Sequence, residues 1–450
     1  MPHAQALARD TDPPLSPVFA VVFLSLVIPV FFELGSLHMS LSRVVLLVLT
    51  PILLAQLFLG RFGKILVTDY LVLGFMFWFT ISTLKNNPQV FVTFVGSNML
   101  ILLGGYLTGR TMVRGPRSAH QMIYLYCGAI LVTLPFAIYE TITSVMPIAR
   151  LLDQIPGIVS SPDVDYEPRR GLHRVQVVFV HPIHYGLFCT MGFGLVMVGL
   201  KRRINGVARW LWAIAIGAAC FLSVSSGPLL GIMMQVALVF YGFAARNLLH
   251  PWKWLLRFSV VGYILLDLLS TRPAYFAIAE RLAFSSGTAY ARKIALDYGL
   301  AQVGRTPIFG VGAGRSWGLP SWMTGSLDNH WLLIAMVYGI PAFALLFGAY
   351  IYTLWKAGRS GHDTDPETKA LHLGWSITTV GTMLTLATVA IWSDIATLGF
   401  LMLGSGVWLT VARVPDTDTP ERTPADTSRS IRYSRFPQRP VDTAHARHSL

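Results

Sequence analysis

The stretch VFVTFVGSNMLILLGGYLT, residues 90–108, carries no charged side chain. A helix needs about 20 mainly apolar residues to cross the hydrocarbon layer of a bilayer, so this stretch is long enough to span a membrane. Similar runs recur along the chain of 450 residues. They lie at 17–33, 43–60, 66–84, 90–108, 119–141, 176–200, 209–224, 228–245, 253–270, 329–354, 371–392 and 395–412. The predicted fold class is therefore all-α, a polytopic membrane protein with about 12 transmembrane helices.

The composition of the whole chain supports this interpretation. Hydrophobic residues make up 54%, charged residues make up only 13%, and the mean hydropathy is +0.56. In soluble domains roughly a quarter of all residues are charged, so a water-soluble enzyme of this length is excluded. The net charge of +13 reflects the loops between the spans, and no nucleic-acid partner is predicted. The cysteines Cys127, Cys189 and Cys220 lie within apolar runs, and their spacing identifies no disulfide framework and no metal site.

Basic residues are concentrated in alternate loops between the predicted spans. One side holds Arg61, Lys64, Arg110, Arg114, Arg117, Lys201, Arg202, Arg203, Arg209, Arg246, Lys253, Arg257, Lys356, Arg359 and Lys369. The short loops opposite hold Arg43 and Lys85. Because cytoplasmic loops carry the excess of lysine and arginine, we expect both termini in the cytoplasm. This gives a cytoplasmic segment at 1–16, a membrane domain at 17–412, and a polar cytoplasmic tail at 413–450 that is expected to be disordered.

Two loops on the opposite side of the membrane, at about 142–175 and 271–328, are long. Loops of this length are uncommon unless they are functional or disordered, and aromatic residues such as Trp317 and Trp322 argue against disorder. Apolar residues recur near helical spacing from Thr288 to Val303. We therefore expect an amphipathic helix inside the larger loop, on the membrane surface or over a cavity. Because binding and catalytic residues are concentrated on loops that a scaffold positions, function is expected on this face.

These two loops contain more cations than carboxylates. The cations are Arg150, Arg169, Arg170, Arg174, Arg272, Arg281, Arg292, Lys293, Arg305 and Arg315. The carboxylates are Asp153, Asp163, Asp165, Glu167, Glu280, Asp297 and Asp328. The planar guanidinium group matches the oxygens of phosphate and diphosphate, so the surplus indicates an anionic ligand. Contacts with lipid headgroups, or local ion pairs, are the alternative explanation for any single arginine.

Four motifs follow one another along the chain. They are RVQVVFVHPIHYG at 174–186, LSVSSGPLLG at 222–231, Ala291-Arg292 followed by TPIFGVGAG at 306–314, and DNHWL at 328–332. In this order, on a scaffold of twelve spans with a large loop before the tenth, they resemble the superfamily of O-antigen ligases and Wzy-type polysaccharide polymerases, and exopolysaccharide polymerases in particular. The resemblance covers nearly the whole chain except the first 16 residues and the tail, and no single motif is specific alone.

The resemblance implies an inverting, metal-independent glycosyltransferase without a cofactor, in the inner membrane of a bacterium, with its active site facing the periplasm. The donor would be a glycan on undecaprenyl diphosphate, the acceptor a second glycan, and the product an exopolysaccharide or O-antigen. Membrane lipids are further partners, and a flippase and a chain-length regulator are candidate ones. The main alternative is a ligase that transfers the glycan to lipid A-core or another acceptor. A transporter with 12 helices is a further alternative, although the two halves of the chain show no similarity.

Candidate site residues follow from the matched motifs. Many family members have Ser-Arg-Gly where this chain has Ser225-Ser226-Gly227, so the arginine credited with diphosphate contact is missing there. Arg174 and Arg292 are the predicted substitutes. Arg281 and Arg315 are predicted to contribute less, and His181, Asn329 and Ser226 are predicted to face the substrate.

The catalytic base is predicted near the start of the tenth span. Ligases show His-Asn where this chain has Asp328-Asn329, with His330 following. A sugar hydroxyl is a weak nucleophile that a positioned base activates. Asp328 matches the motif position, whereas His330 has the better intrinsic pKa. A third alternative is that Asp328 holds an arginine in place.

Overall fold

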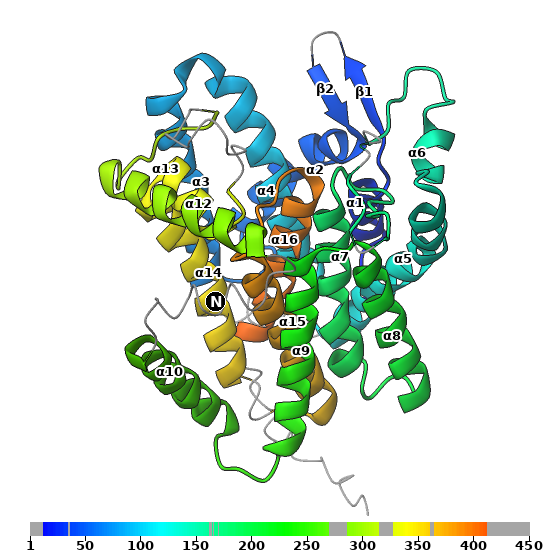
Figure 1. Ribbon diagram of the computed structural model, residues 1–450, viewed down its shortest axis with the longest axis vertical. Helices are drawn as coiled ribbons and strands as arrows, with labels where there is room; N and C mark the ends of the chain where they lie inside the picture. The colour runs from blue at the N-terminus through cyan, green and yellow to red at the C-terminus, as the bar shows by residue number, and fades with distance from the viewer. Residues whose placement is uncertain are drawn as a thin grey trace, which may run out of the picture. The chain divides into compact units, whose positions relative to one another are not determined.

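The computed structural model describes residues 12–34, 37–161, 164, 166–169, 171–269, 286–314, 327–360 and 364–411, and these are almost entirely helical (Figure 1). The α-helices are α1 (Pro17–Val27), α2 (Leu41–Phe58), α3 (Val67–Asn86), α4 (Phe91–Met112), α5 (Pro116–Thr143), α6 (Pro147–Leu152), α7 (Pro182–Gly194), α8 (Gly206–Leu222), α9 (Ser226–Ala244), α10 (Pro251–Leu269), α12 (Ser286–Arg305), α13 (His330–Tyr338), α14 (Ile340–Ser360), α15 (Pro366–Leu386) and α16 (Ser393–Ser405). Short 3-10 or π turns form η2 (Pro88–Val90), η3 (Leu195–Gly199) and η5 (Val407–Thr410).

Eight of the described helical segments are long and apolar enough to cross a membrane. They are Leu41–Phe58, Val67–Asn86, Pro88–Met112, Pro116–Thr143, Pro182–Gly199, Ser226–Ala244, Ile340–Ser360 and Ser393–Thr410. Seven of them coincide with spans predicted from the sequence, and Ile340–Ser360 overlaps only the second half of the predicted tenth span, 329–354. The chain is therefore a helical protein with the composition and helix lengths of a membrane protein.

The four other predicted spans are also helical, but their helices are shorter or carry more polar and charged residues than the eight above. Helix α1 has 11 residues and α8 has 17. Helix α10 carries Lys253, Arg257 and Asp267, and α15 begins with polar and charged residues. The total of twelve crossings stays a prediction.

The first predicted span, 17–33, ends earlier than its apolar composition indicates. Helix α1 ends at Val27, and Pro29 follows within two residues. A proline has no N–H to donate to the preceding helical turn, so the chain leaves the helix there. It continues as an antiparallel hairpin of β1 (Phe31–Leu34) and β2 (Leu37–Ser40), with Phe31 paired to Ser40.

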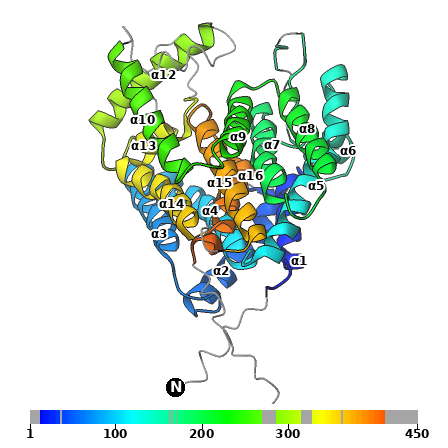
Figure 2. The ribbon, with the colours of Figure 1, turned by 90° about the horizontal axis from the view of Figure 1, so that it is seen from below.

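Helices α7 and α16 lie at the centre of the described helices (Figure 2). Of the residues in Pro182–Gly199 and Ser393–Thr410, 94% and 83% are buried by other helices, against 28% in α2. Helix α16 packs closely on α4 through glycines. A Cβ at Gly105 would lie 2.6 Å from the Thr397 carbonyl oxygen, and one at Gly404 would collide with the backbone of Tyr106. Small residues of this kind let the backbones of membrane helices approach one another.

A buried ion pair joins the first turn of α3 to the last turn of α4. Arg110 Nε donates to Asp69 Oδ1 at 3.0 Å, and Tyr106 donates its hydroxyl to the same oxygen. Arg110 was assigned to a cytoplasmic loop from the sequence, but it lies inside α4 and is only 5% exposed. Its charge is therefore matched within the fold, and breaking a buried pair of this kind typically costs about 3–5 kcal/mol.

The predicted tenth span, 329–354, is broken into α13 and α14 at Gly339. The backbone of Gly339 has φ +91°, and a Cβ there would collide with the Ile308 carbonyl group. The loop at 306–314, called here the glycine loop, fills this break: Ile340 N donates to Pro307 O at 2.7 Å. The stretch 288–303 is helical, as predicted, and forms α12, which packs on α13 through Ala295 and Gly299 (Figure 1).

Candidate functional site

Four helices begin in one region of the molecule: α7, α9, α13 and α16. The His330 N–H donates to the Val389 carbonyl oxygen at 3.1 Å, which joins α13 to the segment before α16. A Cβ at Gly227 would lie 2.6 Å from the Val389 side chain, which places the start of α9 there too. The ring of Trp392, at the start of α16, lies 5.7 Å from that of His181, at the start of α7. The N-terminal end of a helix carries a partial positive charge from the helix dipole, so this region favours an anion.

Arg174 enters this region from the segment before α7. That segment is held by Glu140, whose carboxylate accepts hydrogen bonds from the backbone N–H groups of Gln176 and Val177 at 2.8 and 2.9 Å. Arg174 Nη2 donates to Ser225 Oγ at 3.3 Å, and the guanidinium carbon lies 5.4 Å from the centre of the Tyr166 ring. These contacts fix the side chain against the first residues of α9.

The Arg174 side chain is only partly paired. Its Nε is buried and has no hydrogen-bond partner among the described residues, and no carboxylate there pairs with it. Burial, and then the charge of the neighbouring Arg169, lower the pKa of Arg174 to about 10. The group therefore remains charged at neutral pH. A buried donor without a partner is unfavourable, and a bound anion would satisfy it.

Arg292 and Asp328 form an ion pair in the same region. Arg292 lies on α12, and its Nε is 3.6 Å from Oδ2 of Asp328, two residues before the start of α13. The charge of Asp328 also raises the pKa of Arg174, so this carboxylate is close enough to act on both arginines. We call Arg169, Arg174, Arg292 and Asp328 the arginine site. Three cations against one carboxylate leave the arginine site positive.

The two histidines of the sixth predicted span lie beside the arginine site. His181 is not within the helix but caps it: its Nδ1 accepts from Ile183 N at 3.0 Å. Burial, and then the charges of Arg174 and Arg169, lower the pKa of His181 to about 4. The ring is therefore neutral at pH 7, with its hydrogen on Nε2 as a donor. His184 is buried, and its ring packs edge-on against Trp392 at 4.2 Å.

The remaining predicted residues near α13 and α9 have structural contacts. Asn329 caps α13, since its Oδ1 accepts from Leu332 N at 3.1 Å. His330 is the first residue of α13 and is only 8% exposed. Ser226 is buried as the first residue of α9, and its neighbour Ser225 makes the contact with Arg174. Arg281 and Arg315 lie outside the described residues.

The structure adds residues that the sequence motifs did not identify. Tyr166 and Arg169 act on Arg174 from a loop that carries no motif. Trp392, which lies outside the four sequence motifs, packs on both histidines. The available signal was its place directly before Ser393 and Asp394, where polar residues open the last predicted span.

No protein-family model and no curated protein matches this sequence. The arginine site is therefore interpreted from its own chemistry. A positive, partly buried wall of guanidinium groups beside four helix N-termini is suited to bind a phosphate or diphosphate, with a carboxylate at its edge to accept a proton.

Proposed function

We propose that this protein is a glycosyltransferase that polymerises undecaprenyl-diphosphate-linked oligosaccharide repeats for exopolysaccharide or O-antigen biosynthesis. It would act without a metal or cofactor and invert the anomeric configuration of the donor. The proposal includes twelve crossings of a bacterial inner membrane, both termini in the cytoplasm, and the arginine site facing the periplasm. The sequence motifs suggest the substrate class, and the arginine site supplies the anion-binding chemistry that such a donor needs.

One observation carries the proposal. Arg174 is held by Ser225 and Tyr166, yet its buried Nε has no partner within the described part of the chain. A fixed, charged and incompletely paired guanidinium group is the arrangement that stabilises negative charge as it develops on a leaving group. Diphosphate is such a leaving group, and Arg292, which pairs with Asp328, supplies a second guanidinium group to the arginine site.

In the proposed reaction, the oxygen of an acceptor hydroxyl group attacks the anomeric carbon of the donor sugar. The bond from that carbon to the diphosphate oxygen breaks, and undecaprenyl diphosphate leaves with the electron pair. The hydroxyl proton passes to a base. Asp328 is the proposed base because its side chain is 36% exposed, whereas His330 is buried in α13. A base must be within hydrogen-bond reach of the proton, and burial removes His330 from that reach.

Deletion of the gene provides the test of the proposed function. We expect lipid-linked single repeats to accumulate and surface polymer to disappear, as measured by mass spectrometry of extracted lipid-linked glycans. Free polymer with an unmodified lipid A-core would identify the ligase instead. Unchanged lipid-linked and surface glycans would contradict both and favour the transporter.

The proposed orientation predicts that Gly304→Cys is labelled from outside the cell and Gly358→Cys is not. Gly304 lies near the end of α12 and Gly358 near the end of α14. Both are exposed, and a Cβ at either position meets no atom within 4 Å, so the two variants are matched. The natural cysteines are buried and should give little background. Labelling with a membrane-impermeant maleimide in intact spheroplasts measures this. Labelling of Gly358→Cys but not of Gly304→Cys would show that the protein has the opposite orientation.

A further inference from the structure

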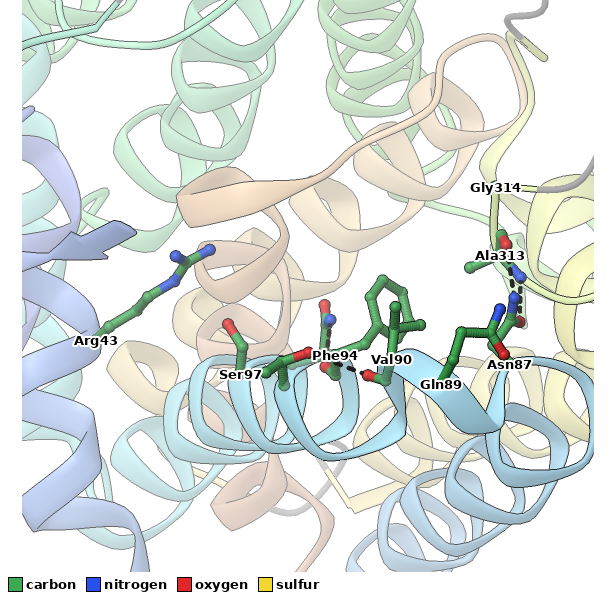
Figure 3. Close-up of a pocket in the computed structure, with 10 residues that line it drawn as sticks. Arg43, Asn87, Gln89, Val90, Phe94, Ser97, Ala313 and Gly314 are labelled. Atoms are coloured by element: carbon green, nitrogen blue, oxygen red, sulfur yellow. Dashed lines mark hydrogen bonds between the residues drawn. The ribbon is translucent and has the colours of Figure 1, made fainter. Parts of the chain in front are cut away.

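An open pocket of about 610 Å³ lies between the first turns of α4 and the glycine loop. Gln89, Phe94 and Ser97 line one side, Arg43 reaches toward it from α2, and Gly314 lies at the opposite end (Figure 3). The start of α2 is joined to the start of α16, because Ser42 Oγ donates to Asp394 Oδ1 at 2.7 Å. The pocket therefore opens on the same face as the arginine site.

The polar residues of the pocket are unusual for their position. Thr93, Ser97 and Asn98 lie within Pro88–Met112, a segment apolar enough to span a membrane. Polar groups in such segments generally face a water-filled cavity or another helix rather than lipid. Within the described part of the chain, the side chains of Gln89 and Ser97 make no hydrogen bond to protein, so both are available to a ligand.

The opposite wall is rigid before any ligand binds. Asn87 Nδ2 donates to Ala313 O, and Ala313 N donates back to Asn87 Oδ1, both at 2.9 Å. Gly312, the residue before Ala313, has φ +85°, and a Cβ there would collide with the Asn87 side chain. On the α4 side, the Phe94 ring stacks on Phe79 with 6.0 Å between the centroids. A preformed pocket loses little conformational entropy when a ligand binds.

Helix α13 sets the separation between the pocket and the arginine site. Asp328 precedes its first residue, and the glycine loop is bonded to its last turn, where Val311 N donates to Met336 O and Gly312 N donates to Val337 O. Nine helical residues span about 13 Å. A ligand whose reacting group lies at Asp328 must therefore be longer than one sugar ring to reach the pocket.

We infer that this pocket binds a sugar of the acceptor glycan, farther along its chain from the reacting hydroxyl group. The inference rests on the proposed function. Amide and hydroxyl groups, from Gln89 and Ser97, are hydrogen-bonding groups that recognise sugar hydroxyls. The fixed face of Phe94 offers an apolar surface to the C–H groups of a sugar ring, as in other pockets with a few convergent polar groups. The glycine loop thereby forms part of the acceptor site.

Ser97→Leu tests this by filling the pocket. Gly96→Leu is the matched control, because it adds the same side chain one residue earlier, where a Cβ meets nothing within 4 Å. The probe is a set of oligosaccharides released by partial acid hydrolysis from the cell's own surface polysaccharide and labelled with a fluorophore. Measured by anisotropy with purified full-length protein, Ser97→Leu is expected to weaken binding at least about tenfold, and Gly96→Leu by less than about twofold.

Gln89→Ala is a second variant, at an exposed position where a change is compatible with folding. It should weaken the same binding about threefold or more. Equal binding by the natural protein, Ser97→Leu and Gln89→Ala would overturn the inference, as would the absence of binding to the natural protein. The binding measurement needs no turnover. A protein that binds the fragments in this pocket but forms no polymer would refute the proposed function and leave the pocket as a sugar-binding site.

Discussion

Replacing Arg174 with alanine is expected to lower the rate of polymer formation about 10²- to 10³-fold, the effect of removing one preorganised donor to a developing negative charge. Arg174 is fixed by Ser225 and Tyr166, and its buried Nε has no partner among the described residues. Arg174→Lys should recover only part of the rate, because a point charge replaces a planar group that binds two oxygens at once. The rate is measured with purified protein and lipid-linked donor.

Arg150→Ala is the control for this variant. Arg150 lies on α6 and is exposed, so its loss should leave the rate within about twofold of the natural protein. The melting temperature of each variant in detergent separates loss of function from loss of fold. Full polymer synthesis by a folded Arg174→Ala protein would remove the central support for the proposed donor site.

Asp328→Asn is expected to lower the rate about 10²- to 10⁴-fold, the usual contribution of a general base. The competing role for Asp328 is to hold Arg292, whose Nε lies 3.6 Å from its carboxylate. A double-mutant cycle separates the two roles. If Asp328 is the base, Asp328→Asn should lower the rate of polymer formation by a further large factor in the Arg292→Ala background. If Asp328 only positions Arg292, adding Asp328→Asn to Arg292→Ala should leave that rate almost unchanged.

The ion pair between Lys293 and Asp297 on α12 is the matched control for this cycle, with 2.8 Å between the charged atoms. Because this pair is partly exposed and lies four residues apart on a helix, Asp297→Asn should change the rate by less than about twofold. His330→Gln should retain more activity than Asp328→Asn. The opposite ranking, with His330→Gln inactive and Asp328→Asn active, would transfer the role of base to His330.

The helices were predictable from the sequence because apolar runs without charge have few other stable conformations in a membrane. Their ends were less predictable, because single residues decide them. Pro29 ends α1 before the apolar run stops, and Gly339 divides α13 from α14 through a contact with the distant Ile308. The cap at His181, with Pro182 following, starts α7 six residues after the predicted boundary at 176.

The arginine site was predictable by residue type but not by geometry. Arg174, Arg292 and Asp328 were selected because they lie in the sequence motifs, within two long loops that carry a surplus of cations. Their mutual contacts depend on residues far apart in the sequence, as with Ser225, which contacts Arg174 across 51 positions. Local motifs carry no such information. The roles of Trp392 and Tyr166 could not be derived for the same reason.

The glycine packing of α4 on α16 has a consequence for how a long product moves. Helix α4 carries the polar pocket, and α16 begins beside the arginine site, so backbone contact between the two fixes the distance between them. Under the proposed function, the two subsites cannot approach or separate during a cycle. Each transfer would then require the acceptor glycan to move relative to two subsites at a constant separation.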